Sequence, residues 1–295
     1  MICSQCFLIW DKVIGWERYT VTVQGMAGHS KWANIKRQKA RVDAVKGKVF
    51  TKISREIIVA ARTGVPDPAG NFQLRTAIEK AKAAGIPNDN IERAIAKGAG
   101  KLGPDNAALE AIRYEGYGPG GVAILIEALT DNRNRTAADL RVAFSKNGGN
   151  LGETGCVGWM FDQKGVVTVS LRPKAEVRGR RGGAIAEVSE EVLLEAFLDG
   201  GADTYELVET EEGTLAEAFT EAANLETLSQ TLKDKDFNVT QVELRWIPNN
   251  TLEVSDPIQA RSLLKMMDAL EDLDDVQSIT ANFEMSDELM SLSLV

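Results

Sequence analysis

Cys3 and Cys6 form the first pattern in the sequence that could carry chemistry, because a CxxC spacing occurs in redox centres and zinc sites. A structural zinc ion needs four ligands, and the chain has neither a second close cysteine pair nor a histidine pair. His29 is the single histidine, so a histidine-based catalytic triad is not expected. Three cysteines, with Cys156 as the third, fit a reducing cytoplasm better than a disulfide framework. The sequence therefore predicts no metal ion and no cofactor.

A glycine-rich stretch, YGPGGVA from Tyr117 to Ala123, could suggest a phosphate-binding loop. Its glycines precede an apolar strand and do not open a helix, so neither the dinucleotide-binding fingerprint nor the P-loop pattern is met. A tight turn between two paired strands explains the same residues. Because no acid, base and nucleophile converge, we expect no catalytic residue, no small-molecule substrate and no enzyme activity. The rival hypothesis is an enzyme that uses a cleft between its α+β domains.

A basic run stands out in a chain whose net charge is -9. Residues 26–103 carry 16 basic and 6 acidic side chains, and eight of the basic ones lie within residues 31–52, opposed by Asp43 alone. Lysine and arginine neutralise phosphates, and an exposed tryptophan can stack on an unpaired base. The predicted nucleic-acid contacts are Lys31, Trp32, Lys36, Arg37, Lys39, Lys46, Lys48 and Lys52. The alternative is a solvated helix surface on which Trp32 anchors a core.

The stretch TDNRNRTAADLR, Thr130 to Arg141, is a second candidate contact. Arg133 and Arg135 lie at the expected start of a helix, where free backbone N–H groups add attraction for phosphate. We therefore name both arginines as secondary nucleic-acid contacts. In the alternative interpretation, Asn132 or Asn134 caps the helix and the arginines pair with nearby acids. The sequence leaves these two interpretations open.

The basic run belongs to a segment with helical periodicity. Apolar residues recur at helical spacing over 44–62, Asn71 can cap a second helix that stops at Gly85, and Asn88 can cap a third that ends at Gly98. Beyond a glycine-rich linker the periodicity changes to strands. We expect a hairpin around residues 111–129, a helix over 136–146, two strands at 157–161 and 165–171, and then alternating helices and strands to residue 283. This order fits two α+β units of the β-α-β-β-α-β kind.

The predicted fold class is therefore α+β and multidomain. An N-terminal three-helix domain is followed by two α+β sandwich-like domains, the third inserted into the second. The proposed boundaries are 1–25 for an N-terminal extension, 26–103 for the basic helical nucleic-acid-binding domain, 107–163 with 247–295 for one α+β domain, and 164–246 for an inserted ferredoxin-like domain. No apolar run approaches the roughly 18 residues of a membrane span, so no membrane partner is expected.

Several long stretches resemble the YebC/PmpR family. They are MAGHSKWANIKRQKARVDAVKGKVFTKISREI, NFQLRTAIEKAKAAGIPNDNIERAIAKG, YEGYGPGGVAILIEALTDNRNRTAADLRVAFSKNGGNLGETGCVGWMF and LLKMMDALEDLDDVQSITANF. The resemblance implies an N-terminal helical domain and two α+β domains in a cytosolic protein that is not an enzyme. It implies DNA binding for the members called transcriptional regulators. It implies action at the ribosome for the translational activators, which include the mitochondrial translational activator of cytochrome oxidase.

Two segments depart from the family pattern. Residues 1–25 have no counterpart, so we expect Met26 to be the native start. The stretch RPKAEVRGRRGGAIAE, residues 172–187, extends a connection that is normally shorter, and it is either an accessory phosphate contact or a tolerated insertion. The choice between DNA and RNA also stays open. The exposed side of the helix over 44–62 carries mostly lysine, which favours backbone binding and hence RNA, while the family label favours DNA.

Overall fold

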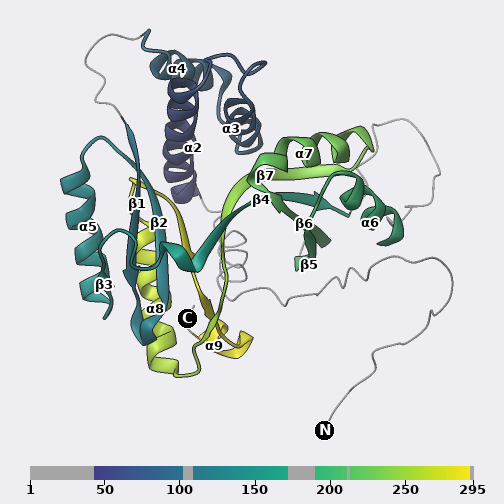
Figure 1. The fold of residues 1–295 in the computed structure, drawn as a ribbon. Coiled ribbons are helices and arrows are strands. Elements are labelled where there is room, and N and C mark those ends of the chain that lie inside the picture. The colour runs from purple at the N-terminus through teal and green to yellow at the C-terminus, as the bar shows by residue number, and fades with distance from the viewer. Residues whose placement is uncertain (1–42, 102–108, 172–189, 211–212, 293–295) are drawn as a thin grey trace, which may run out of the picture.

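The computed structural model describes residues 43–101, 109–171, 190–210 and 213–292. Figure 1 shows a helical bundle above one sheet with its helices and beside a second, more twisted sheet with helices of its own. The predicted α+β class with an N-terminal helical part is confirmed. The predicted N-terminal extension and the insertion at 172–187 lie outside the described residues.

The bundle consists of α2 (Asp43–Thr63), α3 (Phe72–Ala83) and α4 (Asn88–Gly98). Their apolar stripes form one core, in which Ile57 and Leu74 are fully buried. Asn71 caps α3 as predicted, because its side chain accepts a hydrogen bond from the backbone N–H of Leu74 at 3.0 Å. The predicted cap at Asn88 is wrong: Pro87 holds the cap position, and Asn88 is the first residue of the helix.

The end of α4 is as predicted, because Gly98 is the last residue of the helix. The residue in the left-handed conformation is Gly100, with φ 72°. Gly98 also allows α4 to approach α2 closely, since a Cβ at this position would lie 2.5 Å from the carbonyl oxygen of Ile58. Glycine is therefore required at position 98 for helix packing.

The first sheet has the strand order β3-β1-β2-β9 and antiparallel pairing. Its strands are β1 (Glu110–Tyr117), β2 (Ala123–Thr130), β3 (Asn150–Leu151) and β9 (Val276–Ala281). Two helices, α5 (Arg133–Lys146) and α8 (Pro257–Glu271), pack on one face and share a core with the sheet. We call this unit the first α+β body. Its last helix and strand follow the second sheet in the chain, so the second sheet is inserted into it.

The order of elements in this body corrects one expectation. A 3-10 turn, η1 (Pro119–Gly121), joins β1 directly to β2, so the body begins with a hairpin and does not follow the β-α-β-β-α-β order. The helix α5 begins at Arg133 and not at residue 136, because Asn132 caps it by accepting a hydrogen bond from the N–H of Arg135 at 3.1 Å. A short parallel pair, β8 (Leu252–Glu253) with β10 (Phe283–Glu284), and α9 (Asp287–Leu292) complete the body.

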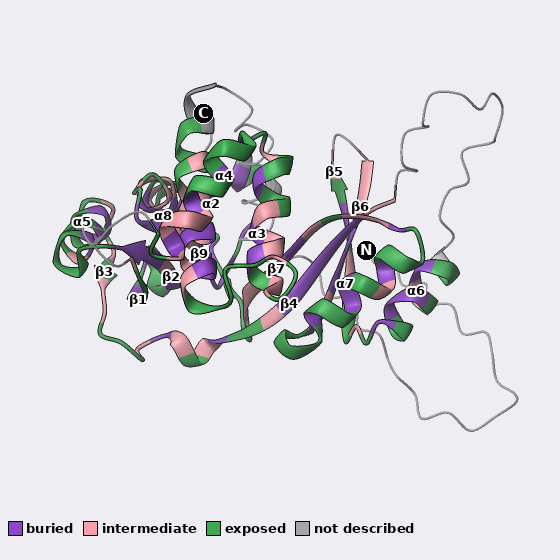
Figure 2. Cartoon of the chain, turned by 90° about the horizontal axis from the view of Figure 1, so that it is seen from above, coloured by how far each residue is buried: buried purple, intermediate pink, exposed green. Residues whose placement is uncertain are grey.

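The second α+β body follows the predicted β-α-β-β-α-β order. It contains β4 (Phe161–Ser170), α6 (Glu190–Asp199), β5 (Thr204–Thr210), β6 (Gly213–Glu221), η3 (Ala222–Asn224), α7 (Leu225–Asp234) and β7 (Asn238–Pro248). The strand order β5-β6-β4-β7 is fully antiparallel and is that of a ferredoxin-like fold. Figure 2 shows buried residues along β4, while the outer faces of α6 and α7 are exposed. One core therefore lies between the sheet and these two helices.

The segment before β4 was predicted to be a strand, and this is wrong. Residues 157–160 form a loop with a short 3-10 turn, η2 (Gly158–Met160), and β4 runs without interruption through the predicted break at 162–164. The carboxylate of Glu115 fixes the loop, because it accepts hydrogen bonds from the N–H groups of Gly155 at 2.8 Å, Val157 at 2.7 Å and Gly158 at 2.6 Å. Glu115 is only 2% exposed. A distant carboxylate thus overrides the local strand propensity.

The titration of Glu115 should make this loop sensitive to acid. Burial alone would raise the pKa of Glu115, but the three backbone donors and the charge of Arg113 hold that pKa below its ordinary value of 4.5. A carboxyl whose pKa is lowered by folding contributes stability above its unfolded pKa, and the contribution disappears as the pH falls through the folded pKa. The loop should therefore be most stable near neutral pH.

We predict that Glu115→Gln lowers the free energy of unfolding by about 2 kcal/mol at pH 7, because the amide leaves buried N–H donors without an acceptor. The difference from the wild type should shrink below pH 4. Denaturant titrations at several pH values measure both effects. Glu153→Gln, an exposed residue in the same loop, is the control and should change little. An equal loss in both variants, or a loss that does not depend on pH, would contradict this role for Glu115.

Candidate nucleic-acid interface

The structure describes four of the ten predicted contact residues. Lys31, Trp32, Lys36, Arg37 and Lys39 precede the described residues, and the side chain of Lys46 is not described although α2 contains it. Lys48 and Lys52 lie on α2, and Arg133 and Arg135 lie in the first turn of α5. The roles of the six undescribed side chains remain predictions.

Lys48 and Lys52 reach the C-terminal end of α8. The Nζ of Lys52 donates to the carbonyl oxygen of Glu271 at 2.9 Å, and the Nζ of Lys48 donates to the Oδ1 of Asp272 at 3.1 Å. The last carbonyl groups of a helix carry partial negative charge, so cations are favourable there. These lysines therefore attach the bundle to the first α+β body. The side chain of Lys48 remains 47% exposed, so solvent reaches it as well.

Arg55 continues this contact and was not among the predicted site residues. Its Nη1 lies 2.9 Å from the Oδ1 of Asp275, and the guanidinium also donates to the carbonyl oxygens of Leu129 and Asp274. The side chain of Asp275 is 9% exposed. Lys48, Lys52 and Arg55 follow the spacing i, i+4 and i+7, which places them on one face of a helix. This spacing was visible in the sequence, whereas the acidic partner was not.

The second oxygen of Asp275 binds the start of α5. Its Oδ2 accepts hydrogen bonds from the Nη2 of Arg135 at 2.9 Å and from the Oγ1 of Thr136 at 2.7 Å, and the hydroxyl of Thr130 lies at 3.2 Å. We call Arg55, Thr130, Arg135, Thr136 and Asp275 the Asp275 cluster. Burial would raise the pKa of Asp275, but the hydrogen bonds from Arg135 and Thr136 and the charges of the two arginines hold it below its ordinary value. The carboxylate is therefore charged at neutral pH.

The two predicted arginines differ in their surroundings. Arg135 binds both Asp275 and Asp131, so it is part of an internal network. Arg133 has its Nε 3.2 Å from Glu110, in a pair whose side chains are 70% and 55% exposed. An exposed pair contributes little to stability and exchanges readily with solvent ions. The structure thus shows Asn132 capping α5 and both arginines paired with acidic side chains. A phosphate contact by Arg133 remains a prediction.

Other chemistries have little support in the described part of the chain. Within it, no group of three or more His, Cys, Asp or Glu residues is arranged to hold a metal ion. Cys156 is a free thiol, and burial, together with the charge of Glu115, raises its pKa, which disfavours the nucleophilic thiolate. None of the helices with described residues combines the length and apolar character that crossing a bilayer requires.

The Asp275 cluster yields a prediction about how the bundle is held. Asp275→Asn keeps the shape of the side chain but removes the charge opposite Arg55 and Arg135, and hydrogen bonds to charged groups contribute about 1.5–3 kcal/mol each. We expect the free energy of unfolding to fall by about 2 kcal/mol and amide hydrogen exchange in α2 to accelerate. The matched control is Asp274→Asn, since the described contact of Asp274 with Arg55 uses its backbone carbonyl. Similar behaviour of both variants would contradict the prediction.

Comparison with known proteins agrees with this architecture. Residues 30–101 match the N-terminal domain of the TACO1/YebC proteins, and residues 109–283 match their second and third domains. A probable transcriptional regulatory protein of Gloeothece citriformis is 71% identical over 269 residues, which cover 91% of this chain and 100% of the relative. A protein of the same description from a Nostoc species is 72% identical over 268 residues, covering 91% and 99%.

The fold of this chain is also similar to that of a solved structure. The crystal structure of a conserved hypothetical protein from Aquifex aeolicus matches with a TM-score of 0.74 and 42% sequence identity, and the match covers 87% of this chain and 98% of that one. The matched sequence segments include the bundle and almost all of both α+β bodies. The resemblance noted in the sequence is thereby confirmed, and the chain belongs to the TACO1/YebC family.

Proposed function

We propose that the protein is a non-enzymatic, nucleic-acid-binding regulator of gene expression that acts in the cytoplasm. The observation that carries the proposal is the division of charge: 16 basic against 6 acidic side chains over residues 26–103, in a chain with a net charge of -9. Such a basic domain attracts phosphates, while the acidic remainder opposes indiscriminate binding. The relatives named as probable transcriptional regulatory proteins support a regulatory role.

The contacts made by α2 separate the basic residues that are bound within the protein from those that are proposed to bind phosphate. Lys52 and Arg55 bind the end of α8 and the Asp275 cluster, so their charges are largely used within the protein. In our proposal, Lys52 and Arg55 therefore serve mainly to hold the bundle against the first α+β body. The basic residues that precede Lys48 in the sequence make the main phosphate contacts. Lys48 and Arg133, which are 47% and 70% exposed, serve as secondary contacts.

Two kinds of nucleic acid are compatible with this proposal. Reading DNA sequence requires several Arg, Asn or Gln side chains that reach base edges, and the relatives' description as transcriptional regulators favours this function. The alternative is an RNA-associated translation factor that binds ribosomal RNA on the ribosome. The predominance of lysine in residues 31–52 favours this alternative, because lysine neutralises phosphate as a point charge and structured RNA is recognised largely by shape and backbone.

We predict that reversing Lys31, Lys36, Arg37 and Lys39 to glutamate abolishes nucleic-acid binding. For the wild type, a plot of log affinity against log salt concentration should have a slope of about -3 on single strands, which corresponds to roughly four phosphates. The matched control reverses Lys82, Arg93, Lys97 and Lys101, basic residues of the same domain outside the run, and should retain most of the affinity. An equal loss in both variants would mean that net charge alone determines binding, and the proposed interface would be wrong.

The choice between DNA and RNA is tested separately. Sedimentation of cell lysate with and without RNase, together with footprinting on genomic DNA, compares the two functions under the same conditions. Sedimentation with ribosomes that RNase abolishes supports the translation factor. A discrete DNA footprint that persists at high salt supports the transcriptional regulator.

A further inference from the structure

The end of α8 and the turn that follows it are strongly acidic and lie against α2. The sequence there is EDLDD, residues 271–275, so four carboxylates occur within five residues. We call these five residues the acidic turn. Lys48 and Lys52, which also belong to the basic run, donate to it. The Nζ of Lys48 lies 3.1 Å from the Oδ1 of Asp272, and the Nζ of Lys52 lies 2.9 Å from the carbonyl oxygen of Glu271. The acidic turn therefore presents a row of negative oxygens to α2, as a nucleic-acid backbone does.

The contact between α2 and the acidic turn is weakest at its outer end. The side chains of Lys48 and Asp272 are 47% and 72% exposed, whereas those of Arg55 and Asp275 are 21% and 9% exposed. An exposed ion pair contributes little and is screened by salt, while a buried pair is screened much less. Phosphates therefore compete for Lys48 more easily than for Arg55. The weak end is also the end at which α2 continues from the rest of the basic run.

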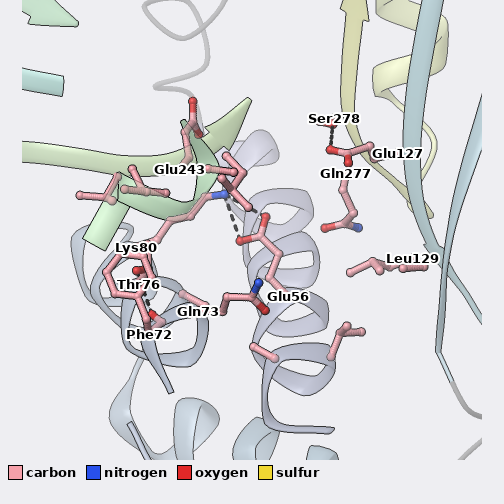
Figure 3. Close-up of a pocket in the computed structure, with 18 of the residues that line it drawn as sticks. Glu56, Phe72, Gln73, Thr76, Lys80, Glu127, Leu129, Glu243, Gln277 and Ser278 are labelled. Atoms are coloured by element: carbon pink, nitrogen blue, oxygen red, sulfur yellow. Dashed lines mark hydrogen bonds and ion pairs between the residues drawn. The ribbon is translucent and has the colours of Figure 1, made fainter. Parts of the chain in front are cut away.

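The bundle can tilt without losing its own core. Its buried apolar residues all lie between Ile53 and Ala94, so the core belongs to the bundle alone. A cavity of about 640 Å³ lies between α2, α3, the sheet face opposite α5 and α8, and β7 (Figure 3). Figure 3 also shows Glu56 of α2 beside this cavity, bound to the Nζ of Lys80 in α3 at 2.8 Å. This contact lies within the bundle, and a small tilt leaves it intact.

A bound strand and the closed contact oppose each other. A strand that follows the basic run as far as Lys48 brings its phosphates next to the carboxylates of the acidic turn, and like charges at such distances repel. The strand and the acidic turn also compete for the same lysine. Two such events are linked with opposite sign, and each weakens the other by the same factor.

We propose that the acidic turn is an internal competitor of nucleic acid for the start of α2. In the free protein it holds Lys48 and Lys52. When a strand binds, its phosphates replace the turn first at Lys48, and the start of α2 moves away from α8 while Arg55 keeps the bundle attached. The inference rests on the proposed nucleic-acid function and adds its regulation. A free phosphate ion gains a single contact and a strand gains several, so the turn favours strands over single phosphates.

Zero-length cross-linking with a carbodiimide tests the displacement, because it joins a lysine to a carboxylate that it contacts. In the full chain, the Lys48–Asp272 cross-link should fall at least about fivefold when saturating single-stranded oligouridylate is added. Inorganic phosphate at the same phosphate concentration should leave it unchanged. The yield is measured by mass spectrometry relative to a matched control, the Lys164–Asp203 pair of the second α+β body, whose atoms lie 3.2 Å apart and whose side chains are 33% and 46% exposed.

A second arm measures affinity. Asp272→Asn removes the exposed carboxylate of the competitor and should raise the affinity for oligouridylate about two- to fivefold, the range expected for an exposed ion pair. The matched control is Asp162→Asn, an exposed residue of β4 that changes the net charge equally, and its affinity should stay close to that of the wild type.

The two arms separate this inference from the proposed function. If oligouridylate binds but the Lys48–Asp272 cross-link persists at saturation, or if Asp272→Asn binds no more tightly than Asp162→Asn, the inference is overturned and the proposed function stands. If neither the wild type nor Asp272→Asn binds a strand, the proposed function fails and the inference fails with it. Binding by Asp272→Asn alone would support the internal competitor.

Discussion

The contact between Arg55 and Asp275 determines how the helical bundle lies on the rest of the protein. Asp275 is in the turn between α8 and β9, Arg55 comes from the middle of α2, and the second carboxylate oxygen binds Arg135 and Thr136 at the start of α5. Three segments that are distant in the sequence therefore meet at one nearly buried carboxylate. Removing one partner of such a group leaves a charge without compensation, which is far more costly than the intact pair is favourable. The arrangement is therefore stable only when it is complete.

The rest of the architecture follows from this attachment. Because Arg55, Lys52 and Lys48 hold one face of α2 against the end of α8, the bundle lies over part of the sheet face opposite α5 and α8. The long strand β7 then passes between the two α+β bodies, and a cavity of about 640 Å³ lies between the bundle, the first sheet and β7. The cationic character of α2 thus has a structural purpose as well as a proposed functional one. Positive charge that is bound to carboxylates and helix carbonyls is not available to phosphates, so the earlier part of the basic run becomes the main candidate interface.

Local features of the sequence predicted the helical elements well. The apolar spacing of α2 correctly indicated its buried face, including Ile53 and Ile57, and Asn71 was correctly identified as a cap. The errors came where a competing local or distant residue decided the structure. Pro87, and not Asn88, occupies the cap position of α4. Residues 157–160 form a loop and not the predicted strand, because their backbone N–H groups donate to the carboxylate of Glu115. The candidate site was harder to predict, because Lys48 pairs with Asp272 at a separation of 224 residues and Arg55 pairs with Asp275 at a separation of 220 residues. Neither leaves a signal in neighbouring residues.

A double-mutant cycle on Arg55→Met and Asp275→Asn tests most directly whether this ion pair holds the bundle in place. The free energy of unfolding is measured for the wild type, both single variants and the double variant, so that the coupling between the two side chains is separated from the contribution of Arg135. We predict a coupling of at least about 1 kcal/mol, with the second substitution costing much less once the first is present. Additive losses, with a coupling near zero, would show that the two charges act independently, and the bundle would then be held by other contacts.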